Sequence, residues 1–181
     1  MSRIMIVDDE ESILKSLQRL LRHVPCTYGN KTFPLVVSAF SKPEEAVEHA
    51  RHESFDLFIS DFRMPGMDGV EFLKAVKAIQ PDAGRLILSG YADLNALLRA
   101  VNEVGIERFI GKPWNDYELI SAIAQSLAHR ELLLENRELA NLGTGWLDHS
   151  RPGISEQTVS QAEQGKRHGH LCLGQTLRNR Y

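Results

Sequence analysis

The chain has 181 residues, which is enough for one ordinary domain with a full hydrophobic core and a modest appendage. Hydrophobic residues make up 43% and charged residues 25%, and the formal net charge is −3, so nothing in the bulk numbers points to direct nucleic-acid binding or to an anionic membrane surface. The two cysteines are far apart in the sequence and no apolar run approaches the roughly 20 residues that span a bilayer, which predicts a cytoplasmic protein.

Two hydrophobic periods alternate along the chain as far as about residue 128. Short apolar runs predict strands, and segments with helical spacing follow each of them. The predicted strands are residues 3–7, 35–40, 55–60, 85–88 and 106–110; the predicted helices are residues 13–24, 43–50, 70–79, 93–104 and a last one from 115 onward. This alternation predicts an α/β fold, a doubly wound five-stranded parallel sheet with helices on both faces.

Two tetrapeptides have the spacing of a capping box, in which an N-cap side chain and a Glu three residues later bond to each other's backbone. They are Ser41-Lys42-Pro43-Glu44 and Asn115-Asp116-Tyr117-Glu118. We therefore expect the second and the last helix to begin there.

The last helix is predicted to run past the main domain. We expect a main domain at residues 1–128, a helical extension at 129–142 and, at 143–181, a flexible tail rich in Gly, Ser, Gln and Arg. The series Ala128, Leu132, Glu135, Leu139 and Leu142 is heptad-like over about two heptads. Two interpretations stay open, a helix that forms a homodimer or the end of an ordinary helix.

Polar residues follow four of the predicted strands. Asp8 and Asp9 end the first, Asp61 the third, Ser89 the fourth and Lys112 the fifth. In open parallel sheets ligands bind outside the carboxyl ends of the strands, and a flavodoxin-like order of 2-1-3-4-5 places strands one and three side by side. Three carboxylates in one crevice repel each other, and a hard Mg²⁺ ion with oxygen ligands offsets that repulsion. The constellation therefore suits phosphoryl chemistry.

The set Asp8-Asp9, Asp61 to Gly69 (sequence DFRMPGMDG), Ser89-Gly90 and Lys112-Pro113 resembles the receiver domain of two-component response regulators over roughly residues 1–128. The stretches Ser89-Gly90-Tyr91-Ala92-Asp93 and Lys112-Pro113-Trp114 further resemble receivers that precede HD-GYP-type outputs.

The resemblance implies roles for individual residues. Asp61 would accept a phosphoryl group from a sensor histidine kinase or a phosphotransfer protein. Asp9, Asp61 and the main-chain carbonyl of Arg63 would bind Mg²⁺, with Asp8 helping through water. Lys112 and Ser89 would contact the phosphoryl group, Phe109 would be the switch aromatic, and the Lys112-Pro113 bond would be cis. The expected function is a phosphorylation-controlled switch and not a turnover enzyme, read out on the surface of the fourth helix, fifth strand and fifth helix.

Two alternatives remain. A haloacid-dehalogenase-like phosphatase also uses an Asp nucleophile with Ser/Thr, Lys and Mg²⁺, but its nucleophile follows the first strand, where this chain has Asp8-Asp9-Glu10. A pseudo-receiver would bind partners without being phosphorylated, although all five site positions are present here.

Overall fold

The structure is a computed structural model that describes residues 1–90 and 104–145, with side chains as far as residue 142. The chain divides into two compact units, Met1–Gly143 and Thr144–Tyr181. The predicted fourth helix, apart from Val104, and the predicted tail beyond residue 145 lie outside the described residues.

The described elements alternate between strand and helix, as the sequence predicts. They are β1 (Ser2–Val7), α1 (Glu11–His23), β2 (Cys26–Tyr28), β3 (Lys31–Phe33), β4 (Leu35–Phe40), α2 (Pro43–His52), β5 (Leu57–Asp61), α3 (Gly69–Ile79), β6 (Gly84–Ser89), β7 (Arg108–Gly111) and α5 (Asp116–Gly145). The third and fifth predicted strands are each shifted by one or two residues toward the C-terminus.

One five-stranded sheet carries the site. Its order is β4-β1-β5-β6-β7 and all of its neighbouring strands are parallel. This is the predicted order 2-1-3-4-5, and the flavodoxin-like α/β fold with a long C-terminal helix is confirmed. The central strands are apolar on both faces because both faces are covered.

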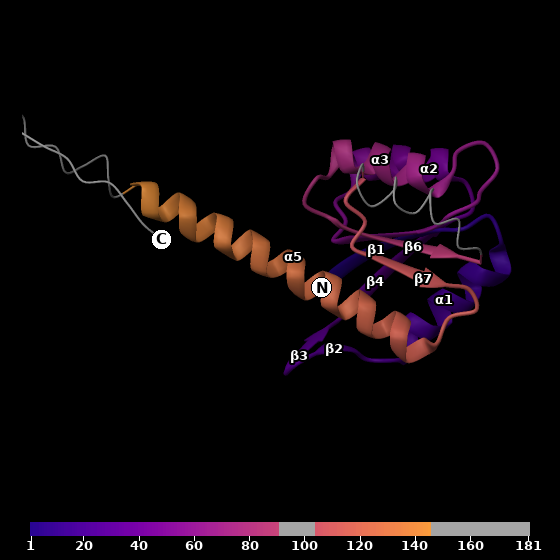
Figure 1. The fold of residues 1–181 in the computed structure, drawn as a ribbon, viewed down its shortest axis with the longest axis horizontal. Coiled ribbons are helices and arrows are strands. Elements are labelled where there is room, and N and C mark those ends of the chain that lie inside the picture. The colour runs from indigo at the N-terminus through magenta and orange to yellow at the C-terminus, as the bar shows by residue number, and fades with distance from the viewer. Residues whose placement is uncertain (91–103, 146–181) are drawn as a thin grey trace, which may run out of the picture. The chain divides into compact units, whose positions relative to one another are not determined.

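Helices cover the two faces of the sheet in pairs (Figure 1). Alternate residues of β1 show the division, since Ile4 and Ile6 pack into the core with α1 and α5, whereas Met5 and Val7 pack into the core with α2 and α3. Each core is a continuous cluster of buried apolar side chains. Of the helices in the described residues, none combines the length and apolarity needed to cross a bilayer.

A short antiparallel hairpin, β2–β3, was not predicted. The hairpin lies between α1 and β4. A two-residue turn at Gly29-Asn30 joins its two strands, and Gly29 has a φ of 58°. A left-handed backbone at this position favours glycine. Cys26 and Phe33 are paired across the hairpin and are both buried, so its inner end packs on the core of α1 and α5.

Of the two predicted N-caps, the structure supports Asn115 and contradicts Ser41. Asn115 accepts backbone hydrogen bonds from Tyr117 and Glu118 at the start of α5, as expected of a cap. The predicted capping box at Ser41 is wrong, because Pro43 occupies the first turn and the N-cap position falls on Lys42, which makes no side-chain cap hydrogen bond. A full capping box is instead formed at α3.

Candidate functional site

Two carboxylates meet at the carboxyl ends of β1 and β5. Asp8 directly follows β1 and is fully buried, and Asp61 is the last residue of β5 and is 7% exposed. The strands are neighbours with Val7 opposite Ser60, so the two acids lie at the same edge of the sheet. Backbone N–H groups hold both side chains: Glu10 donates to Asp8 Oδ1 at 2.9 Å, and Arg63 donates to Asp61 Oδ2 at 2.7 Å.

Lys112 joins the two carboxylates. Its Nζ lies 2.6 Å from Asp8 Oδ2 and 2.5 Å from Asp61 Oδ1. Lys112 follows β7, and β6 lies between β7 and β5, so the side chain crosses the end of β6 to reach both acids. Its backbone N–H donates to the Ser89 carbonyl at 2.7 Å, and the Lys112–Pro113 peptide is cis.

Burial and charge oppose each other in this trio. Burial raises the pKa of Asp8, and the hydrogen bond from Lys112 acts against that rise. Burial alone would lower the pKa of Lys112, but hydrogen bonds to Asp61 and Asp8 outweigh it and raise the pKa. With all three groups ionised the trio carries one net negative charge, which leaves Asp8 incompletely compensated.

Asp9 stands apart from the buried pair, because its side chain is exposed. In the part of the chain that the structure describes, no group of three or more His, Cys, Asp or Glu side chains is placed to hold a metal ion. Mg²⁺, however, usually keeps several waters and takes one or two protein carboxylates together with a phosphate. The hard oxygen donors of Asp8 and Asp61 fit such an ion, and they do not form a closed protein cage.

Ser89 and Phe109 lie on the two strands beyond Asp61. Ser89 ends β6, is 4% exposed and pairs with Gly111 of β7. Phe109 is half-buried, sits opposite Ile87, and packs against the core that the sheet shares with α2 and α3. The sequence therefore places Asp8, Asp61, Ser89, Lys112 and Phe109 on the strands or strand ends where they are found.

The loop between β5 and α3 is held by a capping box at the start of α3, which was not predicted from the sequence. The side chain of Asp68 accepts a hydrogen bond from Glu71 N–H at 2.8 Å, and that of Glu71 accepts one from Asp68 N–H at 3.1 Å. A Cβ on Gly69 would lie 2.0 Å from the Asp61 carbonyl oxygen, so only glycine fits where the loop returns to Asp61. In the sequence, the capping box at α3 could have been predicted from Asp68 and from Glu71 three residues later.

A family model described as the response regulator receiver domain matches residues 4–124. The chain is similar to the hydrogenase transcriptional regulatory protein HoxA of Bradyrhizobium diazoefficiens, with 35% identity over 127 residues, 68% of this chain and 24% of that protein. It is also similar to the C4-dicarboxylate transport transcriptional regulatory protein DctD of Rhizobium meliloti, with 29% identity over 136 residues, 75% of this chain and 27% of that protein.

Among solved structures, the signal receiver domain of an HD domain-containing protein from Pseudomonas fluorescens Pf-5 matches with a TM-score of 0.65 and 32% identity, over 72% of this chain and 97% of that one. The chain spans about a quarter of the length of the two curated relatives.

Proposed function

Because the chain belongs to the response regulator receiver family, we propose that Asp61 accepts a phosphoryl group from a sensor histidine kinase or a phosphotransfer protein and thereby switches the protein between two states. Membership of the family confirms the resemblance found in the sequence, and the neighbour from an HD domain-containing protein agrees with its finer part. The observation that carries the proposal is the contact of Lys112 Nζ with carboxylate oxygens of both Asp8 and Asp61.

In the proposed reaction an Asp61 side-chain oxygen attacks the phosphorus of the donor phosphohistidine. The P–N bond breaks, its electron pair stays on the donor imidazole, and an acyl phosphate forms on Asp61. Water later attacks the phosphorus, which returns the carboxylate and releases inorganic phosphate. The chain is then a substrate of phosphotransfer that resets itself, and it does not turn over a separate substrate.

Asp8, Asp9, the Asp61 carboxylate and the main-chain carbonyl of Arg63 would hold Mg²⁺, which when bound would offset the negative charge on the phosphoryl oxygens. Arg63 N–H already holds Asp61 Oδ2, so that oxygen is fixed while Oδ1 faces Lys112. Asp61 is thus oriented before any phosphoryl group arrives.

Lys112 and Ser89 are the groups proposed to sense the new charge. Lys112 Nζ would exchange its contact with Asp61 Oδ1 for a phosphoryl oxygen, and the Ser89 hydroxyl would donate to another. Ser89 pairs with Gly111 of β7, two residues beyond Phe109, so a shift of Ser89 is passed to the half-buried ring of Phe109. The output surface would be that of the fourth predicted helix, residues 93–104, with β7 and the adjacent part of α5; of that helix only Val104 lies within the described residues.

Intact-mass spectrometry with Mg²⁺ and acetyl phosphate tests this proposal. Wild-type protein should gain one acid-stable, base-labile phosphoryl group, and Asp61→Asn should gain none. Asp116→Asn is the matched control, because Asp116 is an exposed aspartate in the first turn of α5. No adduct on folded wild-type protein would overturn the proposal and favour the pseudo-receiver alternative.

We further propose that the helical extension binds a second copy of the chain. Leu132, Leu139 and Leu142 are 55%, 66% and 67% exposed, and they recur at heptad spacing along α5. On the same helix Arg130 and Arg137, also seven residues apart, form ion pairs with Asp56 and Asp82 of the domain. At about 100° per residue the leucines lie on the face opposite these arginines, so they are turned away from the domain.

A further inference from the structure

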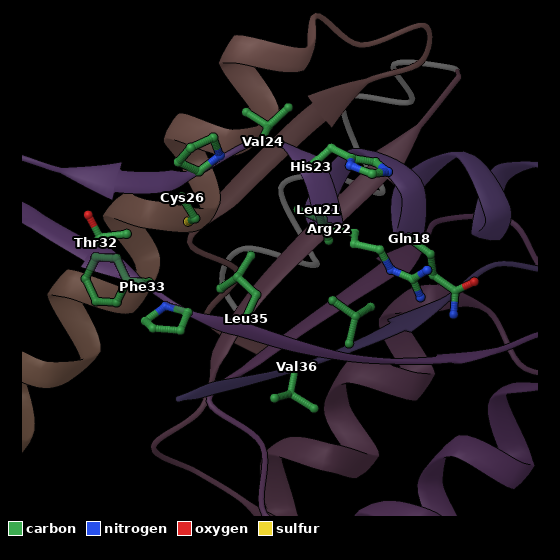
Figure 2. Close-up of a pocket in the computed structure, with 13 residues that line it drawn as sticks. Gln18, Leu21, Arg22, His23, Val24, Cys26, Thr32, Phe33, Leu35 and Val36 are labelled. Carbon is green, nitrogen blue, oxygen red and sulfur yellow. The ribbon is translucent and has the colours of Figure 1, made fainter.

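A pocket of about 510 Å³ lies where the end of α1, the β2–β3 hairpin and the start of β4 meet (Figure 2). Its β4 residues open that strand, whereas Asp8 and Asp61 lie at the carboxyl ends of parallel strands. The pocket is therefore separate from the phosphoacceptor site. Its volume falls within the range of about 300–1,000 Å³ that is usual for small-molecule sites.

Eight of the thirteen residues that line the pocket have apolar side chains. They come from α1, the β2–β3 hairpin, the start of β4 and the connections between them: Leu21, Val24, Pro25, Phe33, Pro34, Leu35, Val36 and Val37. The one thiol in the lining, Cys26, is 1% exposed, and burial raises its pKa to about 11. Cys26 is thus neutral at physiological pH and adds no charge that would oppose an apolar guest.

One fixed positive charge, that of Arg22, lies at one end of the lining. In Figure 2 the Arg22 and Gln18 side chains lie at one end and the Phe33 ring lies at the other, with Leu35 between them. Arg22 and His23 are exposed, and neither forms an ion pair within the part of the chain that the structure describes. Of the thirteen described residues that line the pocket, none is Asp or Glu.

We propose that this pocket binds a small amphipathic molecule with an apolar body and one carboxylate. The body would lie along Leu35 and Val36, which are partly or largely exposed, and it would remove their apolar surface from water. The carboxylate would accept hydrogen bonds from the planar guanidinium of Arg22, whose fork matches carboxylate geometry. Arg22 lies in the last turn of α1, where its positive charge also screens the anion from the partial negative charge of the helix end.

Isothermal titration with decanoate, below its micelle-forming concentration, tests the proposal against 1-decanol as the uncharged probe. Wild-type protein should bind one decanoate, and decanol should bind at least about fivefold more weakly. Arg22→Gln should weaken decanoate binding by about the same factor. Arg19→Gln is the matched control, because Arg19 is an exposed arginine on α1 that does not line the pocket, and it should bind as wild type does.

A second variant tests the location. Val36 is 41% exposed and lines the pocket, so Val36→Trp should fill the space without disturbing the core and should abolish binding. Decanoate should shift amide resonances of residues 18–26 and 32–37 in wild-type protein. Equal affinity for decanol, unchanged binding by Arg22→Gln and Val36→Trp, or shifts confined to the exposed leucines of α5 would each overturn the proposal. Far-ultraviolet circular dichroism and the dispersion of the amide resonances confirm that each variant is folded.

Discussion

Asp8 is a fully buried carboxylate whose ionisation opposes folding, since burial raises its pKa. A carboxyl group with a raised pKa destabilises the folded state above that pKa, and the penalty fades as the pH falls through it toward 3.8. Asp8→Asn keeps an acceptor for the Glu10 N–H and removes the buried charge. We expect the free energy of unfolding at pH 7 to rise by about 1 kcal/mol.

Urea unfolding of wild type and Asp8→Asn at pH 7 and pH 4 measures this effect. The advantage of the variant should shrink as the pH is lowered, because Asp8 of the wild type takes up its proton at a higher pH in the fold than in the unfolded chain. A variant that is clearly less stable at pH 7 would mean that the contact between Asp8 and Lys112 stabilises the fold by more than burial costs.

Lys112→Ala isolates the switching step from the chemical step. The variant removes the ammonium group from both carboxylates but leaves Asp61, the proposed nucleophile, and its hydrogen bond from Arg63 N–H. We expect the protein to stay folded and still to gain a phosphoryl group, while most phosphorylation-dependent amide shifts on β7 and α5 disappear. Lys15→Ala, an exposed lysine paired with Glu11 on α1, is the control. Persistence of the full shift pattern in Lys112→Ala would show that another group couples the two events.

The sequence predicted the strand ends at which the candidate site residues lie, but it did not predict which of their side chains are in contact. Asp8, Asp61, Ser89 and Lys112 could be placed because a polar residue that ends a buried strand lies at the edge of the sheet. That Lys112 crosses β6 to contact both acids, and that Asp9 is exposed beside the buried Asp8, depends on side-chain reach and local backbone direction. Strand periodicity does not encode either property.

Among the elements, α5 forms two ion pairs with the rest of the domain, and one of them is more buried than the other. Arg130 and Asp56 are 22% and 24% exposed and lie 2.7 Å apart, whereas Arg137 and Asp82 are 60% and 40% exposed. Asp56 also accepts a hydrogen bond from the Arg3 N–H at 2.7 Å, and the Arg130 Nε is buried without a partner in the described residues. Asp56 therefore serves two donors that water reaches poorly.

Asp56→Ala should lower the free energy of unfolding by about 2 kcal/mol, because it leaves part-buried donors of Arg3 and Arg130 unsatisfied. Asp82→Ala, the exposed counterpart, should have a much smaller effect that vanishes in high salt. Urea unfolding at low and high salt compares the two variants. Equal losses in both would show that burial does not distinguish the two ion pairs.

The elements themselves were predictable where one signal acted over many residues. Five apolar runs and the helical periods between them were enough for the order of the sheet. The β2–β3 hairpin was missed because each strand has only three residues, too few for a period, and the Gly29-Asn30 turn was its one local signal. The capping box at Ser41 failed because Pro43 fixed the first turn one residue later than the spacing suggested.

For the whole molecule, the exposed leucine face of α5 predicts that two copies of the chain associate. In a parallel pair of α5 helices, Leu132 and Leu139 would occupy one of the two core positions of the heptad. Glu135 and Leu142 would occupy the other. Two Glu135 side chains would then face each other, and their repulsion weakens the dimer. We therefore expect a modest affinity that rises when Glu135 is made neutral.

Sedimentation equilibrium of the full chain tests this arrangement. Leu132→Glu with Leu139→Glu should give a monomer at concentrations where the wild type associates, and Glu135→Leu should tighten the association by roughly tenfold or more, since it replaces two facing charges with an apolar contact. Leu133→Glu is the matched control, because Leu133 is 52% exposed but lies off the heptad face. If Leu133→Glu disrupts association as strongly as the paired variant, or if Glu135→Leu leaves the affinity unchanged, the two helices do not meet through this face. The receiver would then use another surface to bind its second copy.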